Sequence, residues 1–103
     1  AAVGSATVEA ISGLRPDLAF IGANGLSADF GLSTPDPDEA SVKRAIVKAA
    51  RLVVLLADSS KLDQDSLVRF AHLSEIDVLV TDEAPGVALA AALADAGVDV
   101  WLA

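Results

Sequence analysis

The chain of 103 residues has no cysteine and a single histidine, His72. Without cysteine it can form neither a disulfide framework nor a thiolate site, which is compatible with a reducing compartment. His72 lies in an apolar run with no candidate serine beside it, so the pattern predicts a partly buried structural histidine rather than a member of a nucleophile triad. One histidine with scattered acids also makes a poor metal site, and we expect no metal.

Basic residues are scarce as well. Lysine and arginine total 7 against 15 for aspartate and glutamate, which gives a formal net charge of -8. This balance argues against direct binding of DNA by this segment, because phosphate contact needs clustered cations. An anionic small ligand is still compatible with an acidic protein, since a local pocket can be positive.

Long apolar runs, targeting signals and nucleotide-binding motifs are also missing. No apolar run reaches the ~18 residues of a membrane span, and no basic start precedes an apolar segment as in a signal peptide. We therefore expect a cytoplasmic protein with no membrane partner. The sequence has neither G-x-x-x-x-G-K-[ST] nor G-x-G-x-x-G. A receiver-type phosphorylation domain is set aside, because Gly-Ala-Asn-Gly follows Ile21 where an acidic pair is needed.

What the sequence does contain is an alternation of helical and strand patterns. The helical patterns occupy residues 5–14, 37–50 and 87–96, and the apolar strand patterns occupy residues 17–23, 52–56, 76–81 and 98–102. Asp36, Pro37 and Glu39 mark the start of the second helix as a capping box, with Thr34 and Pro35 as a second possible start. Gly97 ends the third helix. The alternation predicts an α/β domain with a mainly parallel sheet and helices on both faces.

Several finer expectations follow from these patterns. Residues 52–56, LVVLL, predict a strand buried on both faces, and Phe20 and Trp101 are expected in the core. The predicted buried face of the second helix consists of Val42, Ile46, Ala49 and Ala50. A hairpin at Asn24-Gly25 is disfavoured, because a polar stretch at residues 27–33 follows instead of a partner strand. Residues 67–72 predict a short strand or an extended segment.

Polar residues follow three of the predicted strands. Asn24 comes after the first, residues 58–61 (Asp-Ser-Ser-Lys) after the second, and Asp82 after the third. Ligands of open parallel sheets bind just beyond the carboxyl ends of the strands, where these loops gather. Lys61 is the only base near the three loops and can meet a phosphate as a point charge. Capping of turns explains Ser59, Ser60 and Asp82 equally well.

Four stretches in order resemble the C-terminal effector domain of the DeoR family of bacterial sugar-metabolism repressors. They are DLAFIGANGLS at 17–27, GLSTPDPDEA at 31–40 running into VKRA, VLLADSSK at 54–61, and IDVLVTD at 76–82. The resemblance implies a cytoplasmic transcription regulator that binds a phosphorylated sugar. It also implies that residues 1–103 are a partial effector-binding domain, lacking the N-terminal DNA-binding reader and the first strand and helix of the domain. DNA would then be contacted only through the missing reader, and a homo-oligomer is expected.

The same domain is similar, more distantly, to phosphopentose isomerases and CoA-transferases. The isomerases have a G-A-D-E type loop and a Glu-Lys pair, where this chain has Gly22-Ala23-Asn24-Gly25 and Val42-Lys43. An amide cannot act as a general base near neutral pH, so the resemblance implies binding without catalysis. We therefore expect no enzyme activity, no catalytic residue and no cofactor.

The resulting hypothesis is a sensor that holds a sugar phosphate across the strand ends. Its ligand-binding residues would be Gly22, Asn24, Gly25, Lys43, Asp58, Ser60 and Lys61. Two alternatives stay open: an oligomerisation module with an inactive pocket, and a residual phosphosugar isomerase. The sequence does not indicate which sugar phosphate is the ligand.

Overall fold

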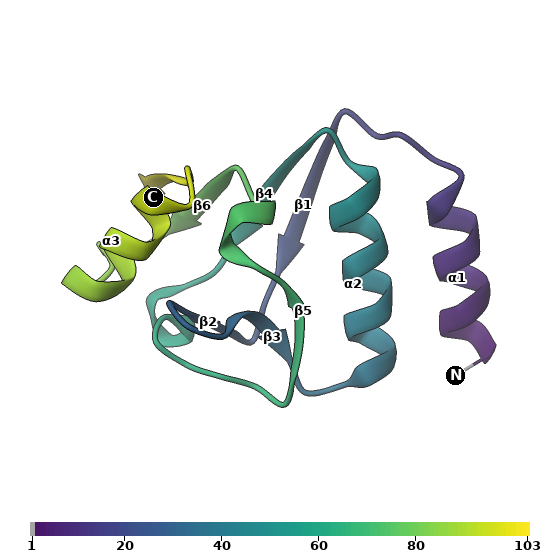
Figure 1. The fold of residues 1–103 in the computed structure, drawn as a ribbon, viewed down its shortest axis with the longest axis horizontal. Helices are drawn as coiled ribbons and strands as arrows, with labels where there is room; N and C mark the ends of the chain where they lie inside the picture. The colour runs from purple at the N-terminus through teal and green to yellow at the C-terminus, as the bar shows by residue number, and fades with distance from the viewer. Residues whose placement is uncertain (1) are drawn as a thin grey trace.

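The computed structural model describes residues 2–103, with side chains from residue 5 onward. The elements are α1 (Ala2–Ser12), β1 (Leu18–Gly22), β2 (Gly25–Ser27), β3 (Gly31–Thr34), α2 (Pro37–Ala49), β4 (Leu52–Leu56), the short turn η1 (Ser59–Lys61), β5 (Val68–Ala71), the short turn η2 (Leu73–Glu75), β6 (Val78–Thr81), α3 (Val87–Asp95) and β7 (Asp99–Leu102). Helices α1 and α2 stand side by side at one end of the molecule, and α3 lies at the other end (Figure 1).

The strands form two sheets. Four parallel strands pair in the order β1-β4-β6-β7, which is also their order along the chain. The other three strands pair antiparallel in the order β2-β3-β5. The predicted α/β class with a mainly parallel sheet is confirmed, and the second sheet is a feature that the sequence patterns did not predict.

The order of the parallel strands decides which face of their sheet is covered. Crossovers between parallel strands are right-handed, so strands that are added in one direction place all their connections on one face. Val53, Leu55 and Leu79 point to that inner face and are buried. On the outer face, Phe20 is 62% exposed and Trp101 is 61% exposed. A helix on the outer face would require the strand order to reverse.

Two expectations fail at this outer face. Phe20 and Trp101 were expected in the core, and they are largely exposed because their strands turn them away from the crossovers. Strand β4 alternates between exposed and buried residues, with Leu52 and Leu56 on the exposed side. Within residues 2–103, therefore, the predicted cover of the sheet on both faces is not found.

The start of α2 follows its sequence signals. Asp36 is the N-cap, its carboxylate accepts a hydrogen bond from the Asp38 N–H at 3.0 Å, and Pro37 is the first helical residue. Glu39 does not complete a capping box but forms an ion pair with Lys43, one helical turn later, at 3.0 Å. The fully buried residues of α2 are Ala40, Val47 and Ala49, whereas Val42, Ile46 and Ala50 of the predicted face are half-buried.

The stretch after Asn24 contains a β-hairpin that the sequence did not predict, although its turn is not at Asn24-Gly25, where a hairpin was disfavoured. Strands β2 and β3 pair antiparallel through a turn at residues 28–30, and Gly31 after it has φ +88°. A Cβ atom at Gly31 would lie 2.5 Å from the Ala71 carbonyl oxygen, so only glycine fits. The serines of this stretch suggested a solvent-exposed loop, but they are buried and hydrogen-bonded. The Ser33 hydroxyl, for example, accepts a hydrogen bond from the Ser66 N–H at 2.8 Å.

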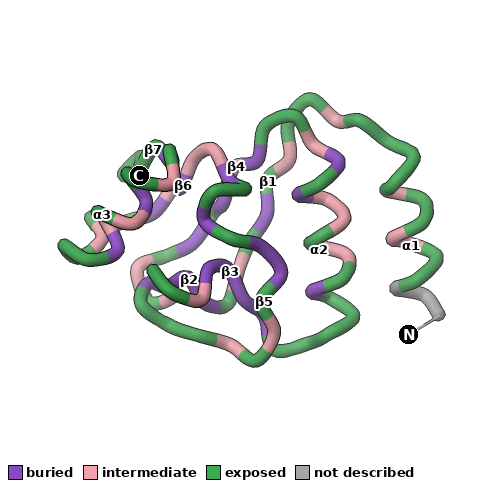
Figure 2. The backbone as a smooth tube through the Cα atoms, in the orientation of Figure 1, coloured by how far each residue is buried: buried purple, intermediate pink, exposed green. Residues whose placement is uncertain are grey.

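The core lies between the two sheets and the inner sides of α2 and α3. Figure 2 shows continuous buried segments in β2 and β3, and every residue of these two strands is buried. The largest fully buried side chains include Phe70, Leu26, Leu32, Leu55, Leu79 and Leu93. At the far end of α3, Gly97 has φ +80° and ends the helix as predicted.

Candidate functional site

Three parallel strands end in one row, at the edge where a ligand was expected. The pairing aligns Gly22 of β1 with Leu56 of β4, and Leu56 with Val80 of β6. Asn24, Asp58 and Asp82 each follow this aligned row by two residues along their own segments. Since neighbouring strands are about 4.8 Å apart, the three polar residues succeed one another along the edge. We call this set the strand-end row.

Asp58 and Ser60 form a self-contained turn in the strand-end row. The Asp58 carboxylate is the N-cap of η1, and it accepts hydrogen bonds from the Ser60 N–H, at 3.0 Å, and from the Ser60 hydroxyl. These bonds, first that of the hydroxyl, lower the pKa of Asp58 below its usual value of 3.8, and the nearby Lys61 ammonium adds to the effect. The carboxylate is therefore charged at neutral pH and poorly suited to accept a proton.

Lys61 closes the same turn and differs from the other lysine of the predicted site. Its backbone N–H bonds to the Asp58 carbonyl at 3.0 Å, which fixes where its side chain begins. The half-buried side chain makes no hydrogen bond or ion pair with any residue that the structure describes. An ammonium with unused donors at a strand-end edge is suited to bind an anion.

Asp82 links two strand ends, a role that the sequence alone did not reveal. Its carboxylate accepts from the Ser59 N–H at 2.6 Å and from the Ser59 hydroxyl at 3.2 Å. The loop after β4 is thereby tied to the loop after β6. The sequence did contain a signal for this link, because Asp82 follows one predicted strand and Ser59 follows another. Capping of a turn explained Asp82 equally well, however.

Asn24 is held by the hairpin rather than by the other strand ends. Its backbone N–H donates to the Ser33 carbonyl at 3.0 Å, and its side-chain oxygen accepts from the Thr34 hydroxyl at 3.2 Å. The side-chain NH2 group has no hydrogen-bond partner among residues 2–103. It is an exposed donor at the first position of the strand-end row.

The two glycines of the predicted site have different surroundings. A Cβ atom at Gly25 would lie 2.4 Å from the Gln64 carbonyl oxygen and 2.8 Å from the Ser33 hydroxyl. Gly25 is buried, so packing within the chain, and not close approach of a ligand, accounts for glycine there. At Gly22 the nearest atom to such a Cβ would be the Leu56 carbonyl oxygen at 3.9 Å, which leaves ordinary space.

The Lys43 ammonium already interacts with other groups of the chain. Its ammonium donates to the Gly22 carbonyl at 2.8 Å, pairs with Glu39, and lies 5.4 Å from the centre of the Phe70 ring. With three partners and a side chain only 18% exposed, it fixes the end of β1 against α2. Among the predicted site residues, the structure thus brings Asn24, Asp58, Ser60 and Lys61 to the open edge and assigns Lys43 and Gly25 to holding the fold.

Two cavities of about 400 and 380 Å³ lie away from the strand-end row. The first is between α1 and α2, and the second lies between the hairpin turn, η2 and α3. His72 lines the second cavity and is exposed, so the expectation of a partly buried histidine is wrong. The reason is local: its segment ends β5, and the His72 N–H bonds to the Glu75 carboxylate at 2.8 Å at the start of η2.

Across residues 2–103, no group of three or more histidine, aspartate or glutamate side chains is placed to hold a metal ion. No helix in the same range is long and apolar enough to cross a membrane.

Comparison with known proteins places these features in a family. The family described as the DeoR C-terminal sensor domain matches residues 1–83. A regulator from Haloferax volcanii named HTH-type transcriptional regulator GlpR is 52% identical over 66 residues, which cover 64% of this chain and 26% of the relative. The HTH-type transcriptional repressor GlcR of Bacillus subtilis is 37% identical over 97 residues, 94% of this chain and 37% of the relative.

A third relative is the glycerol-3-phosphate regulon repressor of Escherichia coli. It is 34% identical over 93 residues, which cover 90% of this chain and 37% of the repressor. The chain thus spans between 26% and 37% of the length of these three curated relatives. All three are named as regulators of transcription.

Proposed function

The chain belongs to the family of DeoR C-terminal sensor domains, and we propose that it is the sensing part of a transcriptional regulator of sugar metabolism that binds a phosphorylated sugar. The observation that carries the proposal is the strand-end row together with the nearby Lys61, whose ammonium makes no hydrogen bond or ion pair with any residue that the structure describes. The full-length protein would contact DNA through a segment other than residues 1–103.

The chemistry of the strand-end row suits a polyol phosphate. The phosphate would be bound by the Lys61 ammonium, as a point charge with three donors. Sugar hydroxyls would donate to the carboxylate oxygens of Asp58 and Asp82 and accept from the Asn24 amide. Ser60 would act indirectly, because its hydroxyl is already bonded to Asp58. The open edge leaves the opposite side of the ligand to be covered by another part of the full-length protein.

Binding could be transmitted through the contact between Ser59 and Asp82. That contact joins the loops after β4 and β6, so a ligand that moves one loop biases the other. A differential affinity of only about 1–3 kcal/mol between two arrangements is enough for a regulatory effect.

Catalysis of phosphosugar isomerisation is not favoured by this geometry. The position of the isomerase acid holds Asn24, and the Asp58 pKa is lowered, not raised toward neutrality. An oligomerisation module is the second candidate, and one observation favours it: the outer face of the parallel sheet exposes Leu18, Phe20 and Trp101.

A thermal-shift screen of the full-length protein tests the proposal. A ligand at 100 times its dissociation constant should stabilise the protein by about 2.7 kcal/mol, which corresponds to several degrees. We expect one sugar phosphate to raise the melting temperature and its unphosphorylated sugar to have no effect. Lys61→Gln should abolish the rise, whereas the control Arg51→Gln, at the amino ends of the strands, should retain it.

The two candidate functions predict different outcomes. If no sugar phosphate stabilises the full-length protein, the sensor is rejected and the oligomerisation module is the better reading. If a sugar phosphate stabilises the wild type and Lys61→Gln equally, the protein senses the ligand but the strand-end row is not its site.

A further inference from the structure

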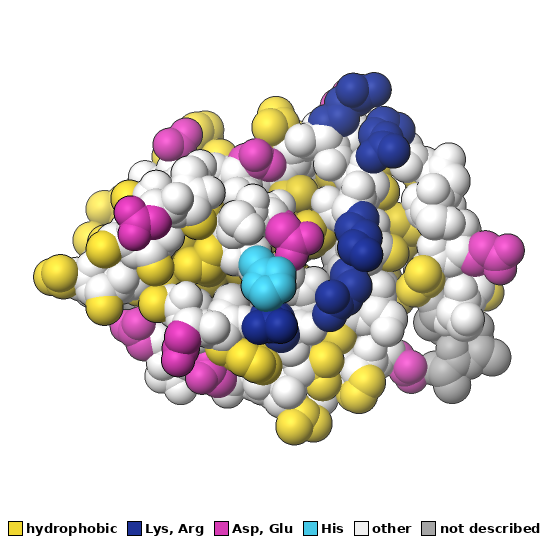
Figure 3. All heavy atoms as spheres, viewed as in Figure 1, with side chains coloured by type: hydrophobic (Ala, Val, Ile, Leu, Met, Phe, Trp, Pro, Cys, Tyr) yellow, Lys and Arg dark blue, Asp and Glu magenta, His cyan; other side chains and the backbone are white. Residues whose placement is uncertain are grey.

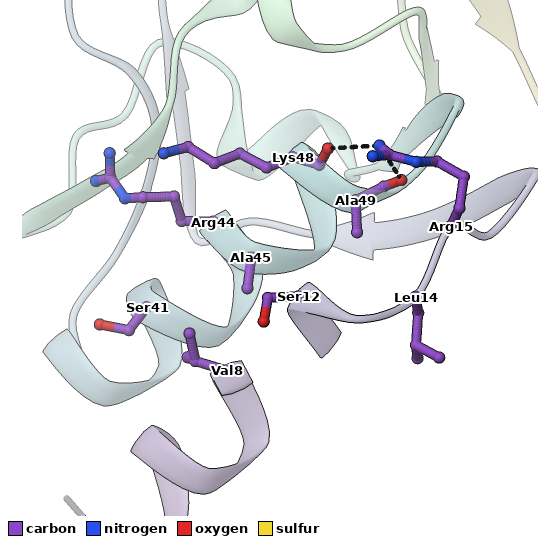
Figure 4. Close-up of a pocket in the computed structure, with 9 residues that line it drawn as sticks. All are labelled: Val8, Ser12, Leu14, Arg15, Ser41, Arg44, Ala45, Lys48 and Ala49. Atoms are coloured by element: carbon purple, nitrogen blue, oxygen red, sulfur yellow. Dashed lines mark hydrogen bonds between the residues drawn. The ribbon is translucent and has the colours of Figure 1, made fainter. Parts of the chain in front are cut away.

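A groove between α1 and α2 has the composition of a second binding site. The two helices pack side by side and line an open groove with a volume of about 400 Å³ (Figure 4). Its walls are formed by Val8, Ser12, Leu14, Arg15, Ser41, Arg44, Ala45, Lys48 and Ala49. This volume is in the range of small-molecule sites, about 300–1,000 Å³.

The charge of the groove is opposite to that of the chain. Three of its nine lining residues are cations and none is an acid, in a chain with 15 acids and 7 bases. The remaining lining residues are apolar or carry hydroxyl groups, and the apolar ones include Val8, Leu14 and Ala45. Figure 3 shows lysine and arginine side chains gathered in a row on the face over α2. An apolar floor beside concentrated positive charge is the pattern that selects an amphipathic anion.

The three cations are not equally engaged. Arg15 donates to the Ala49 carbonyl at 3.1 Å and so covers the end of α2. Arg44 donates through one terminal nitrogen to the Arg69 carbonyl at 2.7 Å, which leaves its other N–H groups for a ligand. The Lys48 ammonium has no hydrogen bond or ion pair with the residues that the structure describes. In Figure 4 the Arg44 and Lys48 side chains extend from α2 toward the same side.

We propose that this groove binds a small organic anion with an apolar body, such as a medium-chain carboxylate. The carboxylate contacts Arg44 and Lys48, and the hydrocarbon lies against Val8 and Ala45. The size of the groove favours a small molecule over a protein segment, because α1 has 11 residues and Arg15 covers one end. The site is separate from the strand-end row and does not depend on the sugar-phosphate proposal.

The test is an NMR titration of the 15N-labelled chain with octanoate, octanol and acetate. Octanoate carries both the charge and the apolar body, octanol only the apolar body, and acetate only the charge. We expect octanoate to shift the amide signals of Val8, Ser12 and Ala45 saturably, and the other two compounds to bind at least about tenfold more weakly. Equal binding of octanoate and octanol would overturn the proposal.

Two double variants complete the experiment. Arg44→Gln with Lys48→Gln should weaken octanoate binding about tenfold, while the charge-matched control Arg51→Gln with Lys61→Gln should leave it unchanged. Both should unfold in urea nearly as the wild type does, since Arg44, Lys48 and Arg51 are exposed. Lys61 is half-buried, but it makes no hydrogen bond or ion pair with any residue that the structure describes. The proposal is wrong if the first variant binds octanoate normally or if octanoate shifts Phe20 and Trp101 on the outer sheet face instead. It is also wrong if an acidic amphipathic peptide shifts the groove signals and octanoate does not.

Discussion

Gly25 offers the sharpest test of how the strand-end loops are built. An alanine Cβ at this position would lie 2.4 Å from the Gln64 carbonyl oxygen, and 2.8 Å from the Ser33 hydroxyl that anchors the Ser66 N–H. Normal contacts to a methyl group are about 3.5 Å, so the loop at residues 62–67 must move by about 1 Å. Gly25→Ala should therefore lower the free energy of unfolding by about 2–4 kcal/mol.

That loss is large for a domain of this size, whose total stability is about 5–15 kcal/mol. It should appear as a fall of more than about 10 °C in the melting temperature, or as a matching shift in the urea midpoint with an unchanged slope. Gly22→Ala is the matched control, because its Cβ would meet nothing closer than 3.9 Å. If Gly25→Ala is as stable as Gly22→Ala, glycine at position 25 is not required by packing and a direct role toward a ligand is restored.

Three further predictions concern the strand-end row and the outer face. NMR titration should give Asp58 a pKa below 3.8, and Ser60→Ala should raise that pKa. Because the pKa of Asp58 is lower in the folded than in the unfolded protein, its hydrogen bonds with Ser60 contribute their full stability above the unfolded-state pKa. This contribution is lost as the pH falls through the folded-state pKa. An unchanged pKa in that variant would contradict the assigned hydrogen bonds. Asp82→Ala should speed hydrogen exchange of the Ser59 amide and destabilise the fold by about 1 kcal/mol in urea unfolding, and an unaltered exchange rate would refute the link. Phe20→Ser should change the free energy of unfolding by less than about 1 kcal/mol and reduce light scattering at high concentration, whereas a large loss would mean that the outer face is covered.

Local signals in the sequence predicted the features that depend on local physics. The cap at Asp36 and the helix stop at Gly97 were predicted because each needs one side chain or one backbone angle that few residues supply. The strand-end positions of Asn24, Asp58 and Asp82 followed from apolar runs and the geometry of parallel sheets. These predictions required no knowledge of what packs on what.

The features that were missed depend on distant partners. The serines of the hairpin favoured the prediction of a loop. Ser27 and Ser33 are nevertheless buried, because residues 65–66 are their hydrogen-bond partners. Phe20 was predicted to lie in the core, because the sequence of an apolar strand does not show which face of its sheet is covered. The hydrogen bond from Lys43 to the Gly22 carbonyl was not predicted, because its two partners lie 21 residues apart in the chain. In each case the deciding contact is tertiary and has no signature in the local pattern.

The agreement between the order of the parallel strands in the sheet and their order in the chain has a consequence for synthesis on the ribosome. Each of β4, β6 and β7 pairs with a parallel strand that has already been made, and β5 likewise pairs with the earlier β3. The sheet can therefore grow from one edge as the chain emerges, without waiting for a later segment to fill a gap between two strands. A nascent chain that has released residue 82 already contains β1, β4 and β6, and with them every member of the strand-end row.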